Sequence, residues 1–222
     1  MSENRWHTSW KSGKIGFHQA RINTRLEEFW PALALEASAP VLVPLCGKSL
    51  DMLFLRQLGH PVVGVELSEI AVEAFFVENQ LSFEHTQTGN LQEFTGTGKA
   101  LGIRLLVGDL FDLETSQTGP LRAFYDRASL IALPSETRQQ YVDKLASLLP
   151  IGAIGLLIGL SYDPSKMSGP PFSVPDAEVQ TRFAQNFQIT ELSHSSGSQR
   201  LGNLAERGLD TMDEHVYQLL RT

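Results

Sequence analysis

The sequence has 222 residues, of which 42% are hydrophobic and 19% are charged. This length and composition are ordinary for a globular protein with one large domain or two small ones. The formal net charge is −7 and the basic residues are scattered along the chain, which argues against nucleic acid as the main ligand.

The chain begins with a polar arm, residues 1–18, that carries Trp6, Trp10 and Phe17. Aromatic side chains on an otherwise polar arm predict that the arm folds back onto another part of the protein. Residues 19–30 follow with apolar side chains on one helical face, and Pro31 disturbs that helix.

Strands and helices alternate beyond residue 40. Apolar spacing predicts strands at 41–45, 61–67, 103–107, 123–126, 153–160, 187–192 and 215–220. It predicts helices at 49–58, at 69–77 with Ser68 as cap, from a Ser135 cap to 149, and at 176–184. A loop rich in Pro, Gly and Ser spans residues 163–175, and the last two strands suit an antiparallel hairpin at one edge of a sheet.

This alternation predicts one α/β domain over residues 1–222, because neither a repeat nor a linker divides the sequence. The sheet is expected to be mostly parallel and covered by helices on both faces. In such sheets ligands bind at the carboxyl ends of the strands, so functional residues are expected just after the first four central strands.

Cys46 is the only cysteine, so the chain cannot form an internal disulfide and a reducing compartment is expected. The six histidines and this cysteine show no metal-ligand spacing, so no metal site is predicted. The polar N-terminus predicts no secretory signal, and no apolar run is long enough to span a membrane, so we expect a cytoplasmic protein. No heptad repeat or long exposed edge requires a partner, and a monomer is expected.

The loop after the first strand contains Gly47-Lys48-Ser49, the end of a nucleotide phosphate loop. The first glycine of that motif is missing, because Leu42 stands five residues before Gly47. One glycine is also too few for a dinucleotide fingerprint, which disfavours a nicotinamide dehydrogenase. The remaining interpretation is a one-glycine turn that admits a ligand close to the backbone, and a carboxylate suits it better than a pyrophosphate.

Glu66 ends the second predicted strand, 19 positions after Gly47. An acidic residue at this place can accept from both hydroxyls of a ribose, although a surface glutamate at a helix start is an alternative. After the third strand, Asp109 could accept from an adenine amino group with Leu110 as apolar packing, or could simply be a turn residue. Arg127 after the fourth strand could hold an anion with its planar fork, or pair with a neighbouring acid. Together these residues suggest an adenosine-bearing ligand with an amino-acid-like tail, which fits S-adenosylmethionine.

The segments PLCGKSLDM and LRQLGHPVVGVELSEIAVEAFF closely resemble the thiopurine S-methyltransferase family, as do WKSGKIGFHQ and YDRASL. The resemblance runs from Trp6 to Leu149, with a weaker tail. It implies the class I methyltransferase fold, a seven-stranded, mostly parallel sheet with an antiparallel last strand and helices on both faces. It also implies S-adenosylmethionine as the methyl donor, and the short N-terminus fits a bacterial type.

Several site residues are implied by this resemblance. Trp10, Leu45, Glu66 and Arg127 correspond to cofactor-contacting positions, and Asp109 and Leu110 to the place that contacts adenine. Gly47 is expected to contact the cofactor because of the one-glycine turn described above. Phe17 corresponds to a position that stacks near the substrate, with His18 beside it as a polar contact, and residues 1–18 resemble a lid over the cofactor. Arg207 in LAERGLD is the nearest match to a further family arginine.

The expected reaction is in-line transfer of a methyl group to a thiolate, which mainly needs positioning and a dry pocket. Arg127 and Arg207 would favour the thiolate electrostatically, so no strong general base is required, and Cys46 is expected to be a small turn residue rather than a nucleophile. The acceptor is expected to be a small thiol such as a thiopurine. Tellurium or selenium compounds are an alternative acceptor, and a non-catalytic S-adenosylmethionine sensor is an alternative of another class.

Overall fold

The computed structural model describes residues 3–88 and 91–222, and within them the chain forms two compact units. The first unit comprises residues up to Tyr125 and the second runs from Asp126 to Thr222. The prediction of one domain over residues 1–222 stays a prediction, and residues 1–2 of the predicted arm lie outside the described part. Among the described residues, no helix combines the length and the apolar character needed to cross a bilayer.

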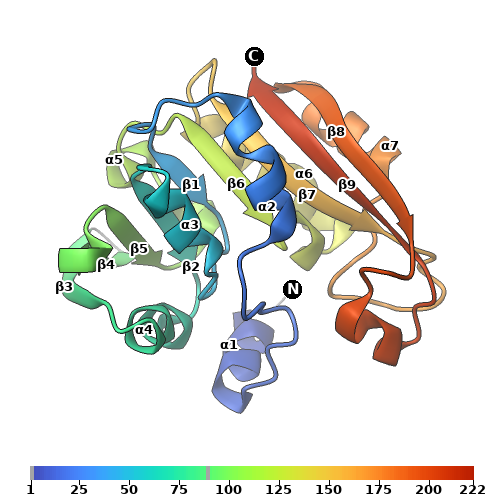
Figure 1. Ribbon diagram of the computed structural model, residues 1–222, viewed down its shortest axis with the longest axis horizontal. Coiled ribbons are helices and arrows are strands. Elements are labelled where there is room, and N and C mark those ends of the chain that lie inside the picture. The colour runs from blue at the N-terminus through green and yellow to red at the C-terminus, as the bar shows by residue number, and fades with distance from the viewer. Residues whose placement is uncertain (1–2, 89–90) are drawn as a thin grey trace. The chain divides into compact units, whose positions relative to one another are not determined.

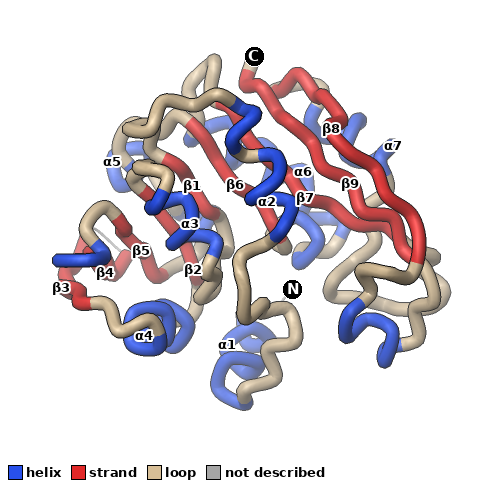
Figure 2. The backbone as a smooth tube through the Cα atoms, in the orientation of Figure 1, coloured by secondary structure: helices blue, strands red, loops and turns tan. Residues whose placement is uncertain are grey.

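The first unit combines strands, α-helices and short 3₁₀ helices (Figures 1 and 2). Its helices are α1 (Glu3–Ser12), α2 (Thr24–Phe29), α3 (Asp51–Gln57), α4 (Glu69–Glu78) and α5 (Thr115–Thr118). Its strands are β1 (Val41–Val43), β2 (Val62–Glu66), β3 (Ser82–Thr88), β4 (Leu91–Thr97) and β5 (Ile103–Val107), and it contains the start of β6 (Ala123–Arg127).

Strands β5, β2, β1 and β6 are parallel neighbours in that order. β1 is buried along its whole length and so is β2, as expected for strands with helices on both faces. Glu66 pairs with Val107 in β5, so the carboxyl ends of β2 and β5 lie side by side. This register brings the residues that follow the two strands to one edge of the sheet.

Strands β3 and β4 form an antiparallel hairpin that continues the sheet beyond β5. The sequence did not predict them, because their apolar side chains are few, with Phe94 the large apolar residue buried in the described part of β4. The expected seven strands are therefore too few, since the described residues form nine. The parallel centre and the antiparallel last strand were predicted correctly.

The second unit holds the helices α6 (Ser135–Leu148) and α7 (Asp176–Phe183) and the strands β7 (Ile154–Ser161), β8 (Phe187–Gly197) and β9 (Met212–Arg221). β9 lies between β7 and β8 and is antiparallel to both. Figure 1 shows β8 and β9 as a long ribbon. The predicted hairpin of the last two strands is thus confirmed, and both strands extend farther than expected.

Two predicted helix caps differ from the structure. Ser68 occupies the cap position of α4, but its side chain makes no capping hydrogen bond. Helix α6 begins at Ser135 itself, and Pro134 stands at the cap position. Helix α2 is shorter than the predicted 19–30, because Asn23 caps it by accepting a hydrogen bond from the amide of Arg25.

Candidate functional site at the ends of strands β1 and β2

The Glu66 carboxylate joins the turns that follow β1 and β2. Its Oε2 accepts a hydrogen bond of 2.9 Å from the amide of Gly47, and its Oε1 accepts one of 2.9 Å from the amide of Ser68. Glu66 is only 6% exposed. The predicted 19-residue spacing therefore corresponds to a direct contact, and Glu66 braces the two turns against each other.

The backbone of the turn after β1 adopts a sparsely populated conformation. Leu45 has φ +46°, in the left-handed region that non-glycine residues rarely occupy, and Gly47 has φ +52°. This explains why β1 ends at Val43 instead of continuing to Leu45 as predicted. Non-glycine residues of this kind cluster at ligand-binding sites, where the surrounding structure holds them in place.

Trp10 of α1 lies over this turn. A Cβ added to Gly47 would come within 3.1 Å of the Trp10 Cζ2 atom, a tight contact that the indole could relieve only by moving. The Trp10 side chain also forms a hydrogen bond with Glu66. Trp10 is 7% exposed, which agrees with the prediction that the arm folds back onto the protein.

Phe17 completes an aromatic group on the arm. Its ring meets Trp10 edge-on at a centroid distance of 5.3 Å and Trp6 at 5.4 Å. Such edge-to-face pairs stabilise by roughly 0.5–1.5 kcal/mol beyond the area that they bury. His18 is half-buried, and its amide donates to the carbonyl of Ile15. The structure thus joins Phe17 to Trp10, while a ligand role for Phe17 or His18 stays a prediction.

Burial controls the ionisation of the two acidic groups here. It raises the pKa of Glu66, and the hydrogen bonds from Ser68, Gly47, Leu67 and Trp10 partly oppose that increase. Burial also raises the pKa of the Cys46 thiol well above its ordinary value, and the nearby charge of Glu66 adds to the effect. A thiol with a raised pKa is a poor nucleophile, which agrees with the interpretation of Cys46 as a turn residue.

Asp109 and Leu110 follow β5 beside the end of β2. The amide of Gly108 donates to the backbone carbonyl of Glu66 at 2.9 Å, which holds the two strand ends together. Asp109 Oδ1 accepts from the amide of Phe111 and so caps a 3₁₀ turn, while Leu110 is fully buried. The turn role that the sequence left open for Asp109 is therefore present, and its contact with adenine stays a prediction.

Arg127 ends β6 in the second unit, directly after Asp126. Asp126 is fully buried, receives a 2.6 Å hydrogen bond from the Tyr141 hydroxyl and accepts from the amides of Ser129 and Leu130. Ala128, the next residue after Arg127, has φ +68°. The Arg127 side chain is half-buried. Its backbone lies between the hydrogen-bonded Asp126 and Ala128, whose left-handed conformation resembles that of Leu45, and these neighbours fix its position.

Arg207 lies in the second unit, at the end of the 3₁₀ helix η5 (Gly202–Arg207). Its Nη1 donates a hydrogen bond of 2.9 Å to the carbonyl of Pro170, in the predicted loop 163–175. Tyr162 belongs to the same region, where it packs in an apolar cluster with Leu204, and the charge of Arg207 opposes the burial that raises the Tyr162 pKa. Arg207 thus holds a loop, and its catalytic role stays a prediction.

Sequence reasoning missed Asp51 and the unused hydroxyl of Ser68. Asp51 is fully buried at the start of α3, where it accepts from the amide of Asn23 at 2.8 Å and from the Tyr125 hydroxyl at 3.0 Å. These bonds fix α3, and with it the turn that contains Gly47. The buried Oγ of Ser68 has no hydrogen-bond partner in the described part of the chain. The sequence carried no signal for the Asp51 contacts, because Asn23 and Tyr125 lie 28 and 74 positions away from it.

The architecture is similar to that of solved methyltransferases. A structure described as an S-adenosylmethionine-dependent methyltransferase from Anabaena variabilis aligns with TM-score 0.65 and 16% identity, covering 99% of this chain and 95% of that one. The 1,6-didemethyltoxoflavin-N1-methyltransferase of Burkholderia thailandensis, solved with S-adenosylhomocysteine, aligns with TM-score 0.65 and 15% identity, covering 99% and 87%. These likenesses, at 15–16% identity, concern the fold alone, which is the fold of S-adenosylmethionine-dependent methyltransferases.

Sequence comparison identifies the family. The family model described as thiopurine S-methyltransferase matches residues 1–222. A thiopurine S-methyltransferase from Pseudomonas syringae pv. tomato is 43% identical over 221 residues, which cover 100% of this chain and 99% of the relative. The chain belongs to the thiopurine S-methyltransferase family. It is a methyltransferase that acts on a small molecule and uses S-adenosylmethionine as its methyl donor.

Proposed function

We propose that the protein transfers the methyl group of S-adenosylmethionine to the sulfur of aromatic or heterocyclic thiols, of which thiopurines are the model. The observation that carries this proposal is the match to one family along residues 1–222. The relatives named thiopurine S-methyltransferase, at 43% and 40% identity in Pseudomonas syringae and Shewanella pealeana, support the choice of acceptor.

The ends of β1 and β2 suit an adenosine-bearing cofactor. A glycine turn, a buried carboxylate, a covering indole and the unpartnered hydroxyl of Ser68 lie together there. We assign Glu66 to the ribose hydroxyls and Gly47 and Leu45 to the amino-acid tail, with Asp109 and Leu110 beside the adenine. Trp10 would cover the cofactor, and residues 1–18 would act as its lid within one methyltransferase domain.

When bound, S-adenosylmethionine supplies an electrophilic methyl group on a sulfonium ion. A thiolate sulfur held in line with the sulfonium would accept this methyl group as the old C–S bond breaks, and the two opposite charges would neutralise each other. The protein therefore needs to orient the two sulfurs and exclude water more than to move a proton. We assign to Arg127 and Arg207 the stabilisation of the thiolate, and to Phe17 and His18 contacts with the flat acceptor.

We further propose that the protein works as a cytoplasmic monomer that binds neither nucleic acid nor membranes. The net charge of −7 supports the absence of a nucleic-acid role. Size-exclusion chromatography with light scattering tests the monomer directly, and a mass twice that of one chain would contradict it. Detoxification of tellurium or selenium compounds is a second acceptor hypothesis, which the assay below also addresses.

The test is an activity assay with defined products. Incubation with S-adenosylmethionine and 6-mercaptopurine should yield S-methyl-6-mercaptopurine and S-adenosylhomocysteine in equal amounts, as measured by mass spectrometry. Parallel reactions with selenite and tellurite reveal a metalloid acceptor. Binding of S-adenosylmethionine without turnover of any thiol or metalloid would exclude the proposal and favour the sensor.

A further inference from the structure

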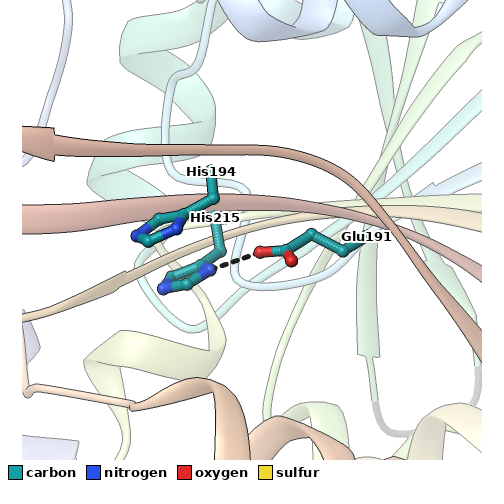
Figure 3. A group of neighbouring side chains, drawn as sticks. All are labelled: Glu191, His194 and His215. Carbon is teal, nitrogen blue, oxygen red and sulfur yellow. Dashed lines mark hydrogen bonds and ion pairs between the residues drawn. The ribbon is translucent and has the colours of Figure 1, made fainter.

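Three potential metal ligands lie together on the β8–β9 ribbon of the second unit (Figure 3). Glu191 and His194 come from β8, and His215 comes from β9. One nitrogen or oxygen atom from each residue lies within 4.8 Å of those from the other two. Nδ1 of His215 lies 2.6 Å from Oε1 of Glu191, and the two imidazole rings are parallel with centroids 4.3 Å apart.

A β-bulge brings these side chains to one face. His194 pairs with His215 and Glu191 pairs with Tyr217, two residues farther along β9 on the same face. In a regular strand Glu191 and His194, three positions apart, would point to opposite faces. The register shift between Glu191 and Ser193 inserts one extra residue and returns Glu191 to the side of His194.

We propose that Glu191, His194 and His215 form a binding site for one divalent transition-metal ion, with Zn²⁺ as the best-suited ion. Two imidazole nitrogens and one carboxylate oxygen form a donor set that suits zinc. Three protein ligands leave a fourth tetrahedral position for water. The sequence contains no ligand spacing of the usual kind, because His215 reaches the other two across a strand pair.

Binding requires only local changes. Ligand atoms about 2.0–2.1 Å from zinc lie roughly 3.3 Å apart in a tetrahedron, so the 2.6 Å contact between His215 and Glu191 must open slightly. The His194 side chain is 49% exposed and can turn out of the stacked arrangement to direct a nitrogen at the ion. His215 is 9% exposed and stacks on Tyr217, which fixes the buried half of the site. A metal ion can bind Nδ1 of His215 only when that nitrogen carries no proton, so the imidazole proton must then lie on Nε2.

The bound ion would attach β8 to β9. In the second unit β8 pairs with β9 alone, and the ion would add a cross-link from two points of β8 to one of β9. An ion that binds only the folded protein stabilises it in proportion to the logarithm of its concentration. This role does not depend on the methyl-transfer reaction, so the test needs neither S-adenosylmethionine nor a thiol.

Calorimetric titration of the full, untagged, chelator-treated chain with ZnCl₂ tests the proposal. We expect one Zn²⁺ to bind per chain. His194→Ala and Glu191→Gln should each weaken binding at least tenfold, and because both side chains are exposed the variants should remain folded by circular dichroism. The matched controls His85→Ala and Glu84→Gln, exposed on β3, should bind like the wild type.

Co²⁺ supplies an independent readout of the same site. Tetrahedral Co²⁺ gives strong visible absorption bands, which should appear in the wild type and in His85→Ala and be lost in His194→Ala. Absence of micromolar Zn²⁺ binding, or equal binding by the wild type and His194→Ala, would overturn the proposal.

Discussion

At the scale of single residues, Glu66 has a structural role in addition to the ribose contact that we propose for it. Its two oxygens already hold the amides of Gly47 and Ser68, so removal of the side chain disturbs the turns as well as any ribose contact. A carboxylate has about four acceptor positions, so it can also receive hydroxyl groups if donors such as the Trp10 indole give way. A simple loss of affinity in a Glu66 variant would therefore be ambiguous.

A double cycle separates the two roles of Glu66. We expect the 2′-deoxy analogue of S-adenosylhomocysteine to bind at least tenfold more weakly than the parent compound to the wild type. In Glu66→Gln, removal of the 2′-hydroxyl from the ligand should lower the affinity much less, because the carboxylate that accepts from this hydroxyl is gone. Calorimetry on the four combinations gives the interaction energy. The exposed Glu69→Gln, at the start of α4, should behave like the wild type. An interaction energy near zero would remove Glu66 from the ribose.

The arginines are tested by kinetics. Replacement of Arg127 or Arg207 by alanine should lower kcat/KM for 6-mercaptopurine by about 10-fold or more, because a charge-assisted contact to the thiolate contributes roughly 1.5–3 kcal/mol. Arg122→Ala removes an exposed arginine as a control and should leave kcat/KM unchanged. Unaltered kcat/KM in both site variants would refute the thiolate role.

At the scale of elements, the buried strands were predicted well and the polar ones were not. The strand at 103–107 was placed correctly to the residue, because four of its five side chains are apolar and glycines stand on both sides of it, at Gly102 and Gly108. The hairpin of β3 and β4 escaped because its side chains are mostly polar on both faces. The end of β1 was placed too late, since a left-handed Leu45 leaves no mark in hydrophobic periodicity.

Gly64 shows how closely β2 packs beneath the site. A Cβ added there would come within 2.5 Å of Leu105 Cδ2 and 2.7 Å of Cys46 Sγ. We expect Gly64→Ala to lower the free energy of unfolding by about 1–3 kcal/mol through overpacking. Urea denaturation measures this change.

The matched control for Gly64 is Gly159, another strand glycine. A Cβ on Gly159 would meet only Tyr217 Cε2, at an ordinary 3.9 Å. Gly159→Ala should therefore leave stability unchanged or slightly raised, because alanine restricts the unfolded chain more than glycine does. If both variants lost stability equally, the cost would come from the strand backbone rather than from packing below the site.

At the scale of the whole molecule, the sequence predicted the contact between the ends of β1 and β2 better than the contacts that hold these turns in place. The sequence indicated the pairing of Gly47 with Glu66, 19 residues apart, because strands and helices alternate regularly in this part of the chain. The Asp51 network and the group of Glu191, His194 and His215 depend on register between distant segments. One sequence contains no direct record of that register.

The pH dependence of stability is a property of the whole molecule that one buried group should dominate. Burial raises the pKa of Asp126 from 3.8 to about 6, although Tyr141, Leu130 and Ser129 donate hydrogen bonds to it. The folded protein holds this proton more tightly than the unfolded chain does. The stabilisation of the folded state by the protonated carboxyl is therefore fully present below pH 4 and is lost as the pH rises through 6. The corresponding free energy is about 3 kcal/mol at 1.36 kcal/mol per pKa unit.

Asp126→Asn removes this titration while keeping an oxygen for the amides of Ser129 and Leu130. We expect the difference in free energy of unfolding, wild type minus Asp126→Asn, to fall by about 2 kcal/mol between pH 4 and pH 7. Urea denaturation at closely spaced pH values measures that difference. Asp143→Asn, an exposed aspartate of α6 that lies outside the Asp126 network, is the control and should give a difference that does not change with pH. If the difference in free energy of unfolding between the wild type and Asp126→Asn also did not change with pH, Asp126 would be ionised throughout this range. Its hydrogen bonds would then lower its pKa more than burial raises it.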